Sequence, residues 1–106
     1  MKNESTQAEF TGIVIDEQTE LTLVDLCGAC AVEVDSIVAL VEEGVLEPSG
    51  GDQIRWRFTG VQLRRATVAL RLQSELGITP AGVALALQLL DEIAVLRARL
   101  RALGDG

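Results

Sequence analysis

The chain of 106 residues contains no histidine and no tyrosine, and aromatic side chains make up only 3% of it. The absence of histidine removes the commonest general base and the commonest metal ligand, and the absence of tyrosine removes a phenolic acid. Two carboxylates would be the remaining acid–base pair, but Glu42 and Glu43 are adjacent and point to different sides of a predicted helix. The sequence therefore predicts a protein that is not an enzyme and that needs no cofactor.

Signals for export or membrane insertion are also lacking. Residues 1–7 are polar, unlike a signal peptide, and no run of about 18 uncharged apolar residues is present to cross a bilayer. The expected compartment is the cytoplasm, with no membrane partner. Hydrophobic residues make up 48% of the chain, enough for one core. We therefore expect a single domain over residues 1–106, with residues 1–7 disordered.

Cysteine is limited to Cys27 and Cys30. Structural zinc needs four ligands, and the chain has no further cysteine and no histidine to supply them. Three residues apart, the two thiols share one helix face with Leu23 and Leu26, where free cysteines behave as small hydrophobic residues. We expect a structural role, with a redox role and a metal shared between subunits as the alternatives.

Positive charge is scarce in the first half of the chain. Residues 1–53 carry twelve acidic side chains against one basic side chain, Lys2, for a net charge of −11. Residues 54–106 carry eight arginines against four acids, a net charge of +4, and the whole chain stands at −7. An excess of this size is more than solubility requires. It predicts a surface that repels nucleic acid and attracts a basic partner.

The apolar pattern predicts a strand over residues 8–16, a polar turn over 17–20 and a helix-turn-helix over 22–44. Thr22 and Asp25 have the spacing of a capping box at the start of the first helix, which ends near Cys30. The second helix is expected from about residue 33 to residue 43, with Gly44 as its left-handed C-terminal residue. Its apolar stripe is predicted at Val34, Ile37, Val38 and Val41.

A small hairpin, or wing, is predicted over residues 45–58, with residues 45–46 paired to residues 54–58. Strict alternation at 54–58 places Trp56 and Phe58 toward the core and Arg55 and Arg57 toward water.

Two long helices complete the predicted chain. A second capping box, at Thr59 and Gln62, begins a helix over 59–76 that ends at Gly77. Thr79 and Pro80 begin the last helix, over 79–103. That helix carries leucines and an isoleucine spaced 4, 3, 4 and 3 residues apart, as in a heptad seam. The seam is formed by Leu89, Ile93, Leu96, Leu100 and Leu103. It either packs on its own domain or joins two copies of the chain as a homodimer.

The order of these elements resembles the MerR-type winged helix-turn-helix. The resemblance is close at Thr22-Leu-Val-Asp-Leu26 and again at Glu42-Glu-Gly-Val-Leu-Glu-Pro48. The expected fold is therefore mainly α with a small β part, a MerR-like winged helix-turn-helix followed by a long C-terminal helix. In MerR-type regulators the second helix carries arginines and a tyrosine pair. Here those positions are Asp35, Val38, Ala39 and Leu40, so the donors that read DNA are missing.

A narrower family is also similar, the chaperone modulatory proteins CbpM. The turn at residues 44–48 and the stretch Gly82-Val-Ala-Leu-Ala-Leu-Gln-Leu-Leu-Asp-Glu-Ile-Ala-Val-Leu96 carry that resemblance. The turn at 17–20 and the cysteine pair depart from it. The resemblance implies a protein that binds the J domain of a DnaJ-like co-chaperone of the CbpA type and inhibits its stimulation of a DnaK-type chaperone. The contacts expected for this role are Glu33, Asp35, Val38, Leu40, Glu42, Glu43 and Glu47.

A MerR-type DNA-binding transcriptional regulator is the alternative function. It would use the arginines of the wing and of the following helix, namely Arg55, Arg57, Arg64 and Arg65. The acidic second helix opposes this role, because like charges repel at a duplex. DNA is therefore not the expected partner.

Overall fold

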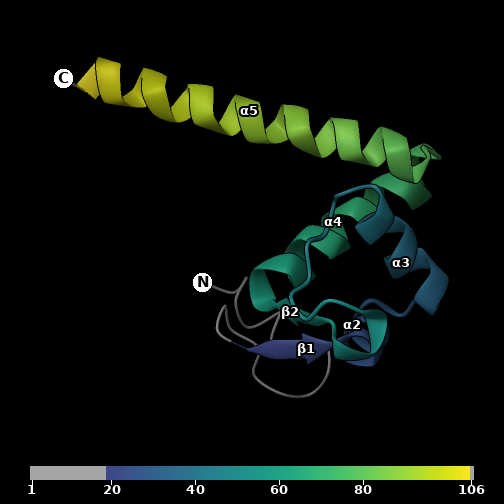
Figure 1. Cartoon of the computed structure of the whole chain (residues 1–106). Coiled ribbons are helices and arrows are strands. Elements are labelled where there is room, and N and C mark those ends of the chain that lie inside the picture. The colour runs from purple at the N-terminus through teal and green to yellow at the C-terminus, as the bar shows by residue number, and fades with distance from the viewer. Residues whose placement is uncertain (1–18, 106) are drawn as a thin grey trace.

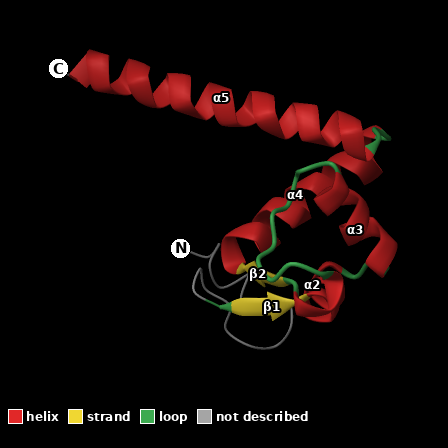
Figure 2. Ribbon diagram, in the orientation of Figure 1, coloured by secondary structure: helices red, strands yellow, loops and turns green. Residues whose placement is uncertain are grey.

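The protein is described by a computed structural model, which covers residues 19–105. Its elements are β1 (Glu20–Thr22), α2 (Leu23–Cys30), α3 (Val34–Glu42), the 3-10 turn η1 (Gln53–Arg55), β2 (Arg57–Thr59), α4 (Gly60–Leu76) and α5 (Pro80–Asp105). The fold is mainly helical with one two-stranded antiparallel sheet and a long last helix, as the sequence predicted (Figures 1 and 2). The predicted disorder at 1–7 and the predicted strand at 8–16 lie outside the described residues.

Helices α2 and α3 form the predicted helix-turn-helix. The Thr22 hydroxyl accepts from the Asp25 amide and the Asp25 carboxylate accepts from the Thr22 amide, both at 3.1 Å, so the capping box is complete. Thr22 is also the last residue of β1, a strand that the sequence did not reveal because three residues are too few to show an alternation. The turn is made by Ala31, whose φ of 58° is left-handed. Gly44 follows α3 with a φ of +80°, as predicted.

The buried face of α3 differs from the predicted stripe. Ile37 and Leu40 are both fully buried, whereas Val34 is 40% exposed. Val38 and Val41 pack against the core from a half-buried position. The reason lies after the helix, where the Val45 amide donates to the Leu40 carbonyl at 2.9 Å and the chain folds back under α3. Leu40 belongs to the core and is fully buried, so the structure contradicts its prediction as an exposed partner contact.

The predicted wing hairpin is wrong in its pairing. Strand β2 pairs antiparallel with β1, with Leu21 opposite Phe58, while residues 45–46 are buried without forming a strand. On its other edge, β2 forms a single isolated antiparallel bridge, between Arg57 and Ser49. The segment before β2 turns instead of extending, because Gly50 and Gly51 adopt φ values of +110° and +87° and residues 53–55 form η1.

The aromatic side chains of the wing nevertheless face inward as predicted. Phe58 is fully buried and Trp56 packs against the core, with the two rings edge to face at 6.1 Å between centroids. Ile54, expected in the strand, lies in η1 and is 90% exposed. Arg55 is exposed, but Arg57 is half-buried and its guanidinium donates to the Trp56 carbonyl at 2.8 Å.

Helix α4 is the central helix, in contact with α2, β2 and α5. Thr59 caps it by accepting from the Gln62 amide at 3.3 Å, and the left-handed Gly77 ends it, as predicted. The Thr79 hydroxyl accepts from the Gly82 amide at 3.1 Å at the start of α5. The core gathers side chains from every helix and strand, from Leu21 to Leu87.

Helix α5 leaves the core after its second turn. Val83 and Leu87 are buried, but every residue from Gln88 to Gly104 is exposed. At about 1.5 Å per residue, the 26 residues of α5 span about 39 Å. The helix therefore projects as an arm from the head formed by the other elements (Figure 1). The small head covers only the first two turns of α5.

Candidate partner-binding surface

The five acidic residues predicted as contacts all lie exposed on or beside α3. We call them the acidic surface: Glu33, Asp35, Glu42, Glu43 and Glu47. Glu33 is the N-cap residue, Asp35 lies in the first turn, and the other three cluster at the C-terminal end. No ion pair between residues 19 and 104 involves any of the five. Their charge is therefore directed at solvent, next to the half-buried Val38.

Charge and helix dipole conflict at the C-terminal end of α3. The carbonyl end of a helix carries a partial negative charge, and basic side chains are favourable there. The last turn of α3 contains no basic residue, and Glu42, Glu43 and Glu47 crowd it instead. Like charges so placed destabilise the free protein slightly, and a bound cation would relieve this repulsion.

A small pocket adjoins this end of α3. It has a volume of about 200 Å³ and is lined by Gly44, Val45, Glu47, Gln62 and Arg65. We call it the α3-end pocket. Arg65 is held at both ends of its guanidinium, since Nε donates to the Val45 carbonyl at 2.9 Å and one terminal nitrogen pairs with Asp91 at 3.3 Å. The salt bridge to Asp91 joins α4 to α5 directly beside α3.

Gln62 was predicted as the second half of a capping box and does something else. Its Nε2 donates to the Glu47 carbonyl at 2.9 Å, fifteen residues away. Its Oε1 is buried and has no hydrogen-bond partner among the described residues. Neither Gln62 nor Arg65 was predicted at the acidic surface, because their partners are distant in sequence and no local pattern reveals such contacts.

The arginines of the alternative, DNA-binding hypothesis do not form one open patch. Arg57 and Arg65 are bonded to backbone carbonyls of the protein itself, and Arg65 is also paired with Asp91. Arg55 is exposed, while Arg64 is half-buried and already engaged. On α3, the positions where the sequence comparison expected DNA-reading donors hold an exposed Asp35, the half-buried Val38 and Ala39, and the buried Leu40.

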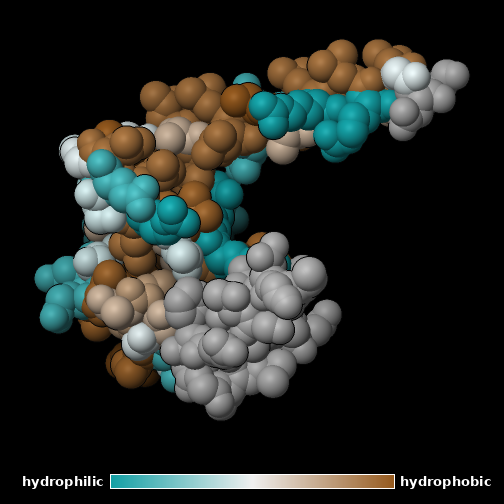
Figure 3. Space-filling view, turned by 180° about the vertical axis from the view of Figure 1, so that it is seen from behind, coloured by the Kyte–Doolittle hydropathy of each residue, from teal (hydrophilic) through white to brown (hydrophobic). Residues whose placement is uncertain are grey.

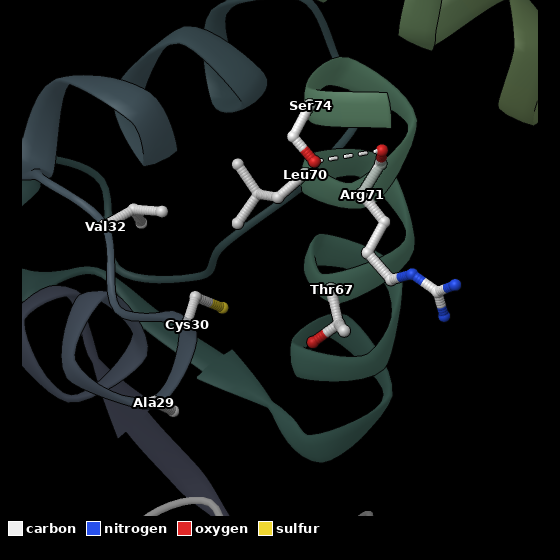
Figure 4. A pocket seen from close by; sticks show the side chains of 7 residues that line it. All are labelled: Ala29, Cys30, Val32, Thr67, Leu70, Arg71 and Ser74. Carbon is white, nitrogen blue, oxygen red and sulfur yellow. Dashed lines mark hydrogen bonds between the residues drawn. The ribbon is translucent and has the colours of Figure 1, made fainter. Parts of the chain in front are cut away.

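The cysteines lie between α2 and α4. Cys27 is buried, and Cys30 packs against the core from a half-buried position, as expected for a structural role. Cys30 lines a pocket of about 280 Å³ with Val32, Leu70 and four other residues (Figure 4). Burial raises the pKa of both thiols above the ordinary 9.0. Nearby Glu33 raises the pKa of Cys27 further, while the neighbouring Thr67 hydroxyl opposes the rise at Cys30.

The residues of the predicted dimer seam lie in the projecting part of α5. Leu89, Ile93, Leu96, Leu100 and Leu103 are between 43% and 78% exposed. Apolar side chains cover much of the arm in the view from behind (Figure 3). The arm thus presents a continuous apolar stripe that the head does not cover.

Residues 19–105 lack two further features, a metal-binding cluster and a membrane-spanning helix. No cluster of three or more cysteine and acidic side chains is arranged to hold a metal ion. Within the same residues, no helix has the length and apolar character needed to cross a membrane.

Comparison with known proteins places these features in a family. The family model described as MerR HTH family regulatory protein matches residues 21–104, which include the helix-turn-helix, the wing and the arm. The chaperone modulatory protein CbpM of Coxiella burnetii (strain Dugway 5J108-111) is 36% identical over 98 residues, covering 92% of each chain. CbpM of Pseudomonas entomophila (strain L48) is 40% identical over 81 residues, covering 74% of this chain and 77% of the relative.

The match over the helix-turn-helix, wing and arm defines the class of protein, a MerR-type helix-turn-helix protein. Within that class, the identity to these relatives over most of the chain defines a narrower family. The chain belongs to the family of chaperone modulatory proteins CbpM.

Proposed function

We propose that this protein is a non-enzymatic chaperone modulator that binds the J domain of a DnaJ-like, CbpA-type co-chaperone in the cytoplasm. Bound there, it inhibits the stimulation of a DnaK-type chaperone by the J domain. The observation that carries this proposal is the acidic surface on α3, in a chain whose relatives are named chaperone modulatory proteins.

Electrostatics supports this role. J domains present a basic helix to the chaperone that they stimulate, and an acidic surface competes for that helix. The five carboxylates are exposed and unpaired among the described residues, so binding a basic helix does not require them to give up an internal ion pair. Charges at the rim of such an interface act mainly on the association rate. Half-buried Val38 is the one apolar contact that remains after Leu40 is assigned to the core.

The test is calorimetry against a J domain encoded in the same genome. Glu42→Lys combined with Glu43→Lys is expected to weaken binding strongly and leave the fold intact, since both side chains are exposed. Arg97→Ala is the matched control, because Arg97 is equally exposed but lies on the arm. Association of the parent protein should slow as salt rises, because screening shortens the reach of the charges.

Inhibition requires a separate readout. Stimulation of ATP hydrolysis by the DnaK-type chaperone in the presence of the J domain should fall as the protein is added, and the double lysine variant should lose this effect. The experiment uses both partners at roughly tens of micromolar, which is enough to form even a weak micromolar complex. If no complex forms under these conditions at two ionic strengths, the proposed function is wrong.

A further inference from the structure

Helix α5 has two apolar faces, and the head covers only one of them. Val83 and Leu87 are buried in the head. Asp91, one turn further along, pairs with Arg65 of α4 at 3.3 Å, so it lies on the same side of α5. Leu96 follows Leu87 by nine residues, about two and a half turns at 3.6 residues per turn. The seam therefore lies on the side of α5 that is turned away from the head.

This second face begins before the predicted seam. Leu85 is 58% exposed and precedes Leu89 by one turn, so it extends the seam toward the head. We call the extended stripe the outer face: Leu85, Leu89, Ile93, Leu96, Leu100 and Leu103. It follows about 27 Å of helix, and apolar side chains are prominent along the arm in Figure 3. Single exposed leucines are common, but a continuous apolar stripe of this length marks an interaction site.

One flank of the outer face carries an acid and a base in a fixed order. Glu92 directly precedes Ile93, and Arg99 directly precedes Leu100, so the two charges lie seven residues apart on the same flank. Both side chains are exposed, and neither has an ion pair among residues 19–104. A single copy thus presents a carboxylate near the head and a guanidinium near the tip of the arm.

Such a flank is complementary to itself when a second copy runs in the opposite direction. In a two-fold contact, a residue that meets another residue of the second copy is met by its counterpart in return. Antiparallel pairing of the outer faces therefore brings Glu92 of each copy beside Arg99 of the other, on both flanks. Flanking charges of this kind select the partner and the orientation in helix pairs. This self-complementarity favours a second copy of the chain over an unrelated protein as the occupant.

We propose that the outer face of α5 binds the outer face of a second copy in antiparallel orientation, with two Glu92–Arg99 ion pairs between the copies. The apolar side chains supply most of the affinity, because exposed ion pairs each contribute little. The ion pairs fix the direction in which the two arms run. The dimer does not depend on the proposed function, since none of these residues belongs to the acidic surface.

A charge exchange tests both the contact and its direction. Glu92→Arg and Arg99→Glu are prepared separately in the full-length protein. Each variant alone would place like charges on both flanks of its own dimer, so its dissociation constant in sedimentation equilibrium should rise about tenfold. In a mixed dimer of the two variants, opposite charges face each other again on both flanks. An equimolar mixture should therefore associate as tightly as the parent protein.

Arg101→Glu is the matched control. It changes the charge as much as Arg99→Glu does, but it lies two residues and about 200° further round the helix. Its dissociation constant should stay within about twofold of that of the parent. Circular dichroism and thermal unfolding check that each variant keeps the fold, as expected for exposed side chains.

The mixture also distinguishes antiparallel from parallel pairing. In a parallel dimer, residue 92 of one copy and residue 99 of the other would be about 10 Å apart along the axis, so mixing the variants would not restore association. The proposal is overturned if the mixture associates no better than the separate variants, or if neither exchange weakens the dimer. A parent protein that stays monomeric at about 200 μM also overturns it, because a second copy is then not the occupant of the outer face.

Discussion

At two positions of the helix-turn-helix, the residue present does not suit its backbone conformation: Gly28 lies inside a helix, and Ala31 adopts a left-handed conformation that favours glycine. Gly28 lies within α2, exposed, where an added Cβ would meet no atom within 4 Å. Glycine inside a helix costs about 0.5–1 kcal/mol relative to alanine. Ala31, by contrast, adopts the left-handed φ of 58°, which costs an L-residue about 1–2 kcal/mol.

We therefore expect Gly28→Ala and Ala31→Gly each to stabilise the protein by about 0.5–1 kcal/mol, although the two substitutions are opposite in kind. Urea unfolding followed by circular dichroism measures the gain. Gly44→Ala is the control in the opposite direction, since Gly44 has a φ of +80° and should lose about 1 kcal/mol. A loss of stability in Gly28→Ala would show that α2 needs flexibility at that position.

The thiols of Cys27 and Cys30 should react slowly in the native protein. Burial raises the pKa of both, so the reactive thiolate is scarce at neutral pH. The folded state also holds these protons more tightly than the unfolded chain, whose thiols ionise near 9.0. The protonated thiols therefore make their full contribution to the free energy of unfolding below pH 9, and this contribution is lost as the pH rises above 9. Labelling with a thiol reagent, native and in urea, measures the first effect, and urea midpoints at pH 7 and pH 10 measure the second. Rapid native labelling of both residues would contradict the structural role.

At the scale of elements, sequence patterns predicted what is encoded locally. The starts of α2, α4 and α5 were predictable because the hydroxyls of Thr22, Thr59 and Thr79 accept from amides three residues ahead. The end of α4 was predictable because the left-handed Gly77 donates its amide to the Gln73 carbonyl. The pairing of β2 with β1 was not, since the strands have three residues each and their paired residues are 35 to 39 positions apart in the sequence. The exposed acids of α3 were predictable from charge alone. Leu40 was misplaced because α3 is apolar on more than one side, and only the return of residues 45–46 decides which side is buried.

Helix α3 also argues against the alternative function, DNA binding as a transcriptional regulator. Phosphate affinity comes from arginine and lysine, and α3 contains neither, while Asp35 occupies a groove-reading position of MerR-type regulators. We expect binding to random-sequence duplex DNA to be weak or absent, even at about 50 mM salt, where phosphate contacts are strongest. Fluorescence anisotropy with a labelled duplex is the measurement. Submicromolar affinity under these conditions would show that the wing and α4 arginines bind DNA without help from α3.

At the scale of the whole molecule, the head and the arm carry different chemistry. The head presents carboxylates at α3, and the arm presents the leucine seam flanked by Arg97, Arg99 and Arg101. The molecule measures 47 × 31 × 29 Å, so the arm gives it one long axis. Exposed apolar patches of this extent in soluble proteins usually mark an interaction site. The outer seam residues Leu96, Leu100 and Leu103 lie on the projecting part of α5, outside the acidic surface.

The geometry of the seam specifies how two copies would meet. In an antiparallel pair centred on Leu96, Leu89 lies opposite Leu103, and Ile93 lies within one residue of the position opposite Leu100. The same arrangement brings Glu92 within one residue of the position opposite Arg99, twice by symmetry. A parallel pair would bring the three arginines of each copy together. Charge therefore favours the antiparallel arrangement, which also keeps the two heads at opposite ends.

We expect the protein to self-associate through this seam. Leu96→Glu with Leu100→Glu should convert the dimer to a monomer, because the pair would bury four carboxylates without partners. Thermal stability of the head should change little, since both side chains are at least 55% exposed in a single copy. Val95→Glu is the matched control, similarly exposed but off the seam, and should leave the dimer intact. Sedimentation velocity distinguishes the species. A dimeric parent whose sedimentation coefficient is unchanged by the double substitution would show that the interface lies elsewhere, and a parent that is monomeric at high concentration would show that the arm serves another contact.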